Sequence, residues 1–147
     1  MGAKVAGVCG TGNIDLVRGL GAERVLDYTR EDIFDPGRLY DVIFDAVAAH
    51  DFWRVRKYLR EEGCYLSTLP SAGLFMGTLA GFVSSKKAAF ILMKARGKDL
   101  EVLNAWIESG ELKPVIDSLF SLDEIQAAHR RSETGRARGK IIIRVKP

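Results

Sequence analysis

The first 28 residues constrain the fold of this chain more strongly than any other segment, because short elements follow one another there in a defined order. A run of small and β-branched residues at 3–9 predicts a strand, and the turn Gly-Thr-Gly-Asn follows at 10–13. The next residues predict a short amphipathic helix at 13–20 that ends at Gly21, and then a second strand at 24–27. A strand, a helix and another strand in this order form the repeating unit of a parallel α/β sheet.

The rest of the first part, 1–95, continues the alternation. Its apolar runs are short and lack polar alternation, which indicates a parallel sheet covered on both faces. We expect strands at 41–46, 63–68 and 88–93, a helix at 51–61, and a Gly- and Ser-rich loop at 71–86 with a helical turn near 75–82. The predicted fold class is α/β, a truncated Rossmann-type doubly wound parallel sheet that starts at its second strand. The first strand, the glycine-rich phosphate turn and the first helix of such a sheet are missing from the sequence.

The second part, 96–147, has the order helix, strand, helix, strand. Ser121 and Glu124 have the spacing of a capping box, which predicts that a helix begins at 122 and continues to 131. A helical stripe is formed by Leu100, Leu103, Ile107 and Leu112, and strands are expected at 115–119 and at 141–145, the latter after a turn bracketed by Gly135 and Gly139.

Five segments, taken in order, resemble the medium-chain dehydrogenase/reductase superfamily, and most closely its zinc-free quinone oxidoreductase branch. They are GVCGTGNIDLVRGLGAERVLDYTRED, YDVIFDAV, GCYLSTLP, WIESGELKPVIDSLFSLDEIQAAH and ETGRARGKIIIRV. The resemblance implies an NAD(P)H-dependent reductase about twice this length, with hydride transfer to a quinone or enone-type small molecule. It implies that this chain is the C-terminal half only, and that 96–147 returns to a catalytic domain in the other half.

The turn at 10–13 bears on the choice between NADH and NADPH. NAD-specific sheets place a carboxylate at the tip of the second strand, whereas this chain has Cys9, Gly10 and Thr11 there and no carboxylate before Asp15. We interpret the turn as the 2′-phosphate pocket of NADPH, with Gly10, Thr11 and Asn13 as donors and Arg18 as an added charge. The alternative is an ordinary tight turn in which Asn13 caps the following helix.

Further cofactor contacts are expected where strands end. In a doubly wound sheet the ligand lies outside the carboxyl ends of the strands, which selects Asp45 and Ala46 after one strand, and Leu69 and Pro70 after the next. Asp45 could instead cap the turn that follows it.

The resemblance adds three candidate cofactor residues. It places Tyr28 at the adenosine end, and Arg138 and Lys140 toward the nicotinamide. The alternatives are a core aromatic at 28 and solvated charges at the mouth of a turn.

The remaining composition argues against other kinds of site. Cys9 and Cys64 are expected to be small buried hydrophobes, because no His or Cys spacing suits a zinc ion. His50 and His129 form no catalytic set, His129 being expected to pack, so we predict no catalytic residue in this chain. The net charge is +3, no nucleic-acid reader motif occurs, and no apolar run reaches 18 residues, so neither nucleic acid nor membrane is an expected partner and the default location is cytoplasmic.

Three expectations follow for the isolated chain. It should bind NADPH weakly or not at all, and the alternative to an enzyme part is a truncated, non-catalytic chain that folds and dimerises without turnover. A homodimer should form through the apolar strand 88–93. Because the missing strand would be central, strands 3–9 and 41–46 should pair directly or borrow a strand from another copy, unless the segment is present in the native protein and lost from this chain. For the isolated chain we favour direct pairing or borrowing, and both stay open.

Overall fold

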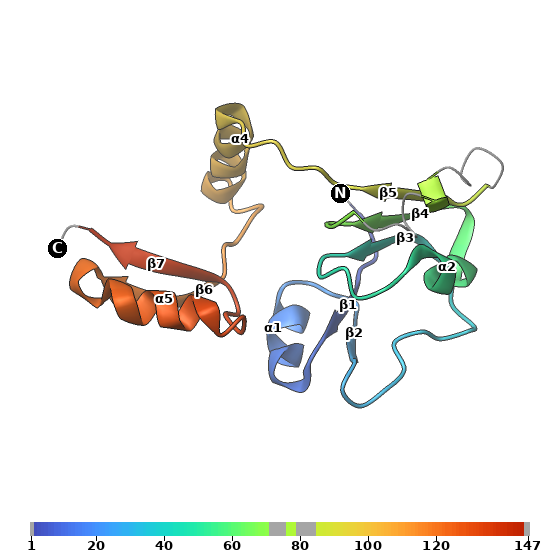
Figure 1. The fold of residues 1–147 in the computed structure, drawn as a ribbon, viewed down its shortest axis with the longest axis horizontal. Helices are drawn as coiled ribbons and strands as arrows, with labels where there is room; N and C mark the ends of the chain where they lie inside the picture. The colour runs from blue at the N-terminus through green and yellow to red at the C-terminus, as the bar shows by residue number, and fades with distance from the viewer. Residues whose placement is uncertain (1, 71–75, 79–84, 146–147) are drawn as a thin grey trace. The chain divides into compact units, whose positions relative to one another are not determined.

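The computed structural model describes residues 2–70, 76–78 and 85–145 of the chain. It divides into two compact units, Met1–Lys94 and Ala95–Pro147. Both units consist of parallel strands joined through helices, so each has α/β character (Figure 1).

Unit 1 begins with a two-stranded parallel sheet. Strand β1 (Ala6–Cys9) leads through the short 3-10 helix η1 (Thr11–Asn13) and helix α1 (Ile14–Gly19) to strand β2 (Arg24–Asp27), which pairs with β1. A side chain at Gly7 would clash with Val17, so the glycine allows α1 to pack closely on this sheet. Gly21 has φ +98°, which confirms its predicted place after the helix end. The side chain of Asn13, however, makes no capping hydrogen bond.

The second sheet of unit 1 has three parallel strands in the order β3-β4-β5. They are β3 (Tyr40–Asp45), β4 (Leu59–Ser67) and β5 (Lys87–Phe90), with helix α2 (Phe52–Val55) and the 3-10 turn η2 (Arg56–Tyr58) between β3 and β4. The core of the unit lies between α2 and this sheet, and consists of Phe52, Val55, Leu59, Tyr65 and Ala88.

Two boundaries in this region differ from the sequence-based prediction. The helix expected at 51–61 ends by 58, because Leu59 is fully buried as the first residue of β4 and pairs with Tyr40. The extra residues of β4 are accommodated by a shift of register between Tyr40 and Val42. The strand expected at 88–93 ends at Phe90. Of the loop expected at 71–86, residues 76–78 are helical, and most of the others lie outside the described residues.

The two sheets of unit 1 remain separate, so the direct pairing expected between 3–9 and 41–46 is wrong. Among the described residues, β1 pairs only with β2, and β3 pairs only with β4. Each of these two strands therefore keeps one unpaired backbone edge.

Unit 2 is a β-α-β arrangement preceded by a helix. Helix α4 (Gly97–Glu108) comes first, followed by β6 (Ile116–Ser121), the turn η3 (Leu122–Glu124), helix α5 (Ile125–Glu133) and β7 (Lys140–Arg144), which pairs in parallel with β6. The predicted capping box is confirmed, since the Glu124 carboxylate accepts a hydrogen bond from the Ser121 backbone N–H at 2.9 Å. None of the helices in the described ranges combines the length and the apolar character needed to cross a bilayer.

Candidate functional site

The turn after β1 lies against the residue that follows β2. A Cβ atom at Gly10 would lie 3.4 Å from the Tyr28 hydroxyl and 3.6 Å from its ring carbon Cζ, which is ordinary contact distance, so the two residues are close neighbours. The Tyr28 side chain is exposed and therefore does not belong to the core. The structure thus brings together Gly10 and Tyr28, two of the residues predicted to contact the cofactor.

Thr11 is engaged by a neighbouring carboxylate that the sequence analysis did not select. Its hydroxyl donates to Asp27 Oδ2, while the Thr29 hydroxyl and backbone N–H donate to Asp27 Oδ1 at 2.6 and 2.9 Å. The hydrogen bonds from Thr11 and Thr29 hold the pKa of Asp27 below its usual value although the side chain is only 4% exposed. A hydroxyl has one proton, so Thr11 is not free to donate to a phosphate in this arrangement. The signal in the sequence was the carboxylate that ends strand 24–27.

The other two polar residues of the predicted phosphate pocket are not held by Asp27. The side-chain amide of Asn13 forms no hydrogen bond to any described residue, and the side chain is only partly buried. Arg18 is exposed and pairs with Asp15 one turn earlier in α1, with 3.1 Å between Nη1 and Oδ1. Exposed pairs of this kind are weak, so Arg18 can leave Asp15 for a stronger anion at small cost.

Asp45 caps the turn that follows β3, as in the alternative interpretation. Its carboxylate accepts the backbone N–H groups of Val47, Ala49 and His50 at 3.2, 3.2 and 2.8 Å, and the Tyr65 hydroxyl at 3.1 Å. Burial raises the pKa of Asp45, but these hydrogen bonds outweigh it and leave the pKa below its usual value. The Asp45 carboxylate is therefore occupied by hydrogen bonds within the protein. At this strand end, only the backbone of Asp45 and Ala46 remains to contact a cofactor.

Hydrogen bonds from Thr68 connect the carboxyl ends of β3 and β4. Its backbone N–H donates to the Asp45 carbonyl at 3.3 Å, and its hydroxyl donates to the Ala46 carbonyl at 3.0 Å. Leu69 and Pro70 follow directly and are exposed. Asp45, Ala46, Leu69 and Pro70 thus lie at the carboxyl ends of neighbouring strands, where ligands of doubly wound sheets bind.

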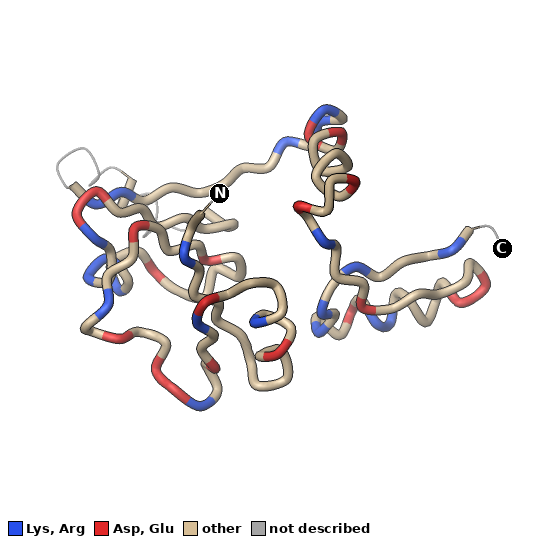
Figure 2. Tube along the Cα trace, turned by 180° about the vertical axis from the view of Figure 1, so that it is seen from behind, with Lys and Arg blue, Asp and Glu red and all other residues tan. Residues whose placement is uncertain are grey.

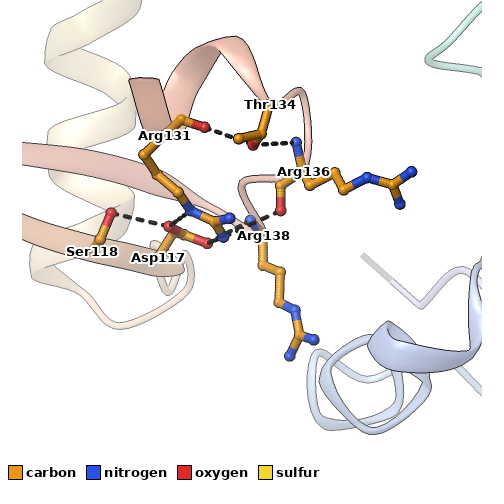
Figure 3. Close-up of polar contacts among 6 residues, drawn as sticks. All are labelled: Asp117, Ser118, Arg131, Thr134, Arg136 and Arg138. Carbon is orange, nitrogen blue, oxygen red and sulfur yellow. Dashed lines mark hydrogen bonds and ion pairs between the residues drawn. The ribbon is translucent and has the colours of Figure 1, made fainter. Parts of the chain in front are cut away.

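In unit 2, Asp117 organises the turn that carries the two basic candidates. Its carboxylate accepts Arg131 Nε and Nη2 at 2.9 and 2.6 Å, and the backbone N–H of Arg138 at 2.9 Å (Figure 3). The Arg131 hydrogen bonds, with that of Arg138, hold the pKa of Asp117 well below its usual value. In Figure 3 the guanidinium groups of Arg136 and Arg138 point away from this carboxylate. The turn is fixed through its backbone, and its charged ends face outward.

Arg138 and Lys140 also line a hollow of about 570 Å³ within unit 2. Its apolar wall comes from α4 and the segment after it, including Leu103, Ile107 and Val115. A Cβ atom at Gly139 would clash with the Val115 backbone, so this glycine permits the close approach of the two segments. Basic and acidic positions are interspersed along both units (Figure 2).

The described residues contain no metal site, and the two histidines lie in different units. No group of three His, Cys, Asp or Glu side chains in the described ranges could hold a metal ion, so the residues present do not fit a zinc ion. Both cysteines are free thiols. His50 lies edge-on to Phe34, with 5.0 Å between the ring centroids, and His129, which was expected to pack, is exposed within its unit.

Comparison with known proteins identifies the family. The family model described as zinc-binding dehydrogenase matches residues 20–143. The chain is 34% identical over 143 residues to the 2-methylene-furan-3-one reductase of Solanum lycopersicum. It has the same identity, over the same length, to the chloroplastic NADPH-dependent alkenal/one oxidoreductase of Arabidopsis thaliana. Each alignment includes 96% of this chain and 33% of the relative. The quinone oxidoreductase structure from Coxiella burnetii superposes with a TM-score of 0.78 at 25% identity, covering 99% of this chain and 46% of that one.

The chain thus spans between a third and a half of the length of these relatives. The matches cover both units. The superposition identifies the parallel α/β architecture as Rossmann-like. The chain belongs to the zinc-binding dehydrogenase family and corresponds to the C-terminal half of a medium-chain dehydrogenase/reductase.

Proposed function

We propose that this chain is the cofactor-binding portion of an NADPH-dependent oxidoreductase that reduces an enone-type or quinone substrate. The observation that carries the proposal is the turn after β1, where Gly10 lies beside Tyr28 and the side-chain amide of Asn13 is without a partner among the described residues. The relatives named as NADPH-dependent alkenal/one oxidoreductase and as quinone oxidoreductase support the same assignment.

In this proposal the residues of unit 1 bind and orient the cofactor. Asn13 and Arg18 would meet the 2′-phosphate, Tyr28 would flank the adenosine, and the backbones of Ala46 and Leu69 would line the remaining length. When bound, NADPH supplies the hydride. We assign the residues of this chain to positioning the cofactor rather than to proton transfer.

We further propose that the 147 residues alone bind NADPH weakly. They contain no glycine-rich turn to offer backbone N–H groups to the pyrophosphate. Hydrogen bonds to charged groups contribute about 1.5–3 kcal/mol each, so the absence of two or three costs roughly 3–9 kcal/mol, on the order of a hundredfold or more in affinity. The second candidate function, a folded dimer without turnover, would follow if no cofactor binds at all.

An NMR titration with NADPH and with NADH tests the proposal at the turn itself. NADPH at millimolar concentration should shift the amide signals of residues 10–13 and of Tyr28, and NADH should shift them less. Asn13→Asp keeps the shape of the side chain but adds a negative charge beside the 2′-phosphate, so it should remove the preference for NADPH. Equal shifts from both cofactors in the unsubstituted chain would count against the proposal.

We also propose that two copies pair through β5. This strand is at the edge of the three-stranded sheet, and Phe90 together with the residues that follow it exposes apolar surface. An exposed apolar edge favours pairing with a second copy.

A further inference from the structure

Asp27 places a negative charge next to the turn after β1. Its side chain is nearly buried, and its carboxylate is charged at neutral pH because hydrogen bonds from Thr11 and Thr29 lower its pKa. Arg30 is exposed, and its Nε lies 3.7 Å from Asp27 Oδ2, so this ion pair is a weak one. The charge therefore acts on an anion that approaches the turn.

The hydrogen bonds to Asp27 determine where the protons of two exposed threonines lie. Thr11 Oγ1 is 2.5 Å from Asp27 Oδ2, and Thr29 Oγ1 is 2.6 Å from Oδ1. A charged carboxylate only accepts hydrogen bonds, so both hydroxyls donate to it, and each hydroxyl has one proton. The 3.0 Å contact between the two threonine oxygens therefore has no proton in it. Both oxygens offer only lone pairs to a ligand at this surface.

A surface of this kind treats the two nicotinamide cofactors differently. The 2′-phosphate of NADPH is an anion that needs hydrogen-bond donors, whereas the 2′-hydroxyl of NADH can itself donate to a threonine oxygen. We propose that Asp27 is a positioning residue that limits the preference for NADPH, because it holds the Thr11 proton away from the 2′-phosphate. This inference rests on the proposed function, in which Asn13 and Arg18 meet that phosphate.

The geometry defines what a neutral residue at position 27 would do. In Asp27→Asn the side-chain oxygen must take the place of Oδ1, because the Thr29 backbone N–H donates there at 2.9 Å and cannot reverse its role. The amide NH₂ group then takes the place of Oδ2 and donates to Thr11 Oγ1. The Thr11 proton is thereby released and can be donated to a phosphate oxygen. The substitution thus adds a donor to the turn and removes a charge.

The probes are adenosine 2′,5′-bisphosphate and adenosine 5′-monophosphate, which differ only in the 2′-phosphate. Neither contains a pyrophosphate, so the comparison does not depend on a glycine-rich turn. Asp27→Asn should tighten binding of the bisphosphate at least about tenfold, as one added hydrogen bond to a charged group predicts, and should change binding of the monophosphate by less than about twofold. NMR titration of the ¹⁵N-labelled chains measures both Kd values. A purely structural role of Asp27 would weaken both nucleotides alike.

Matched variants separate the released proton from the lost charge. In the Asp27→Asn background, Thr11→Val should abolish the gain and Thr11→Ser should keep it, because serine retains the hydroxyl. Glu31→Gln removes a charge from the same loop without touching Thr11, and its carboxylate is exposed, so it should change bisphosphate binding by less than about twofold.

A measurement without nucleotide tests the hydrogen bond itself. Thr11→Val removes a donor to the charged carboxylate, so it should raise the pKa of Asp27, followed through its carboxyl ¹³C signal, and Thr11→Ser should not. If circular dichroism shows Asp27→Asn unfolded, Thr11→Val in the otherwise unsubstituted chain replaces it. Bisphosphate binding should then stay within about twofold, because the Thr11 proton does not reach the phosphate.

The proposal is overturned if folded Asp27→Asn binds the bisphosphate no more tightly than the unsubstituted chain, or if its gain survives Thr11→Val. It is equally overturned if Thr11→Val leaves the pKa of Asp27 unchanged, or if that variant alone weakens bisphosphate binding about tenfold. A failure of the proposed function differs from these results, because it would appear as equal responses to NADPH and NADH while the pKa of Asp27 still rises in Thr11→Val.

Discussion

Three aspartates at strand ends show how single residues set the local structure. Asp27 accepts hydrogen bonds from Thr11 and Thr29. Asp45 accepts them from three backbone N–H groups and from Tyr65. Asp117 accepts them from Arg131 and from the backbone of Arg138. Each carboxylate is nearly buried, and hydrogen bonds stabilise its charged form. The sequence predicted Asp45 at a strand end, but each of the three also has a partner that is distant in sequence, 16 positions away for Thr11, 20 for Tyr65 and 21 for Arg138, which local patterns do not reveal.

The buried Tyr65 hydroxyl is expected to stabilise unit 1. It is buried and points its one proton toward Asp45 Oδ2 and the His50 carbonyl, the latter at 2.6 Å. Tyr65→Phe leaves these acceptors short of a donor, so it should lower the free energy of unfolding of unit 1 by about 1–3 kcal/mol. Urea unfolding followed by Trp53 fluorescence, in a Trp106→Phe background, measures this. Tyr28→Phe, at an exposed tyrosine, is the matched control and should change little.

The protonation of Tyr65 does not complicate that test. Burial, with the Asp45 carboxylate nearby, raises its pKa to about 12, so the hydroxyl keeps its proton throughout the neutral range. The loss caused by Tyr65→Phe should therefore be the same at pH 6 and pH 8. A difference between these pH values would contradict the assigned donor role.

Asp117 gives a prediction with a defined dependence on pH. Its pKa is lowered in the folded chain, so its contribution to stability is present above the unfolded pKa of about 3.9 and is lost as pH falls through the lower folded value. Asp117→Asn should destabilise unit 2 at pH 7, and the gap to the unsubstituted chain should narrow below pH 4. Trp106 fluorescence in a Trp53→Phe background follows this unit, and Glu111→Gln, an exposed site, is the control. A gap that widens on acidification would contradict the assigned interaction.

At the scale of elements, local signals predicted those whose ends are determined by neighbouring residues. The strand at 24–27 has the predicted bounds, Gly21 follows α1, and the Ser121–Glu124 capping box opens the helical segment that contains α5. The helix predicted at 51–61 was too long because Leu59 continues a helical pattern in sequence but pairs with Tyr40 in space. Long-range pairing overrides local propensity at such a boundary.

The edge of β5 gives a prediction for dimerisation. Phe90→Pro should shift the chain toward monomer, since it removes an outward N–H from the proposed pairing edge. Ile91→Pro is a poorer test, because the Ile91 N–H donates to Ser67 within the same chain at 2.9 Å. Phe44→Pro, at the opposite edge, is the control. Light scattering at high concentration that gives a monomer for the unsubstituted chain would contradict the proposed dimer.

At the scale of the whole molecule, composition and element order predicted an α/β chain of Rossmann type, which the family match and the superposition confirm. They did not predict that β1 and β3 would stay unpaired, because that outcome depends on tertiary geometry. The hydrogen-bond partners of Arg138 and Lys140 could not be predicted either. Their backbone N–H groups donate to Asp117 and Val115, which belong to a distant segment of the chain.

A hybrid enzyme tests whether this chain is the NADPH-binding portion of a reductase. Residues 3–145 of this chain would replace the matched region of the tomato 2-methylene-furan-3-one reductase, which supplies the remaining length. We predict that the folded hybrid binds NADPH more tightly than NADH and reduces an enone substrate, and that Asn13→Asp removes the cofactor preference. A folded hybrid that binds neither cofactor, or that binds NADH as tightly as NADPH, would contradict the assignment of this chain as the NADPH-binding portion.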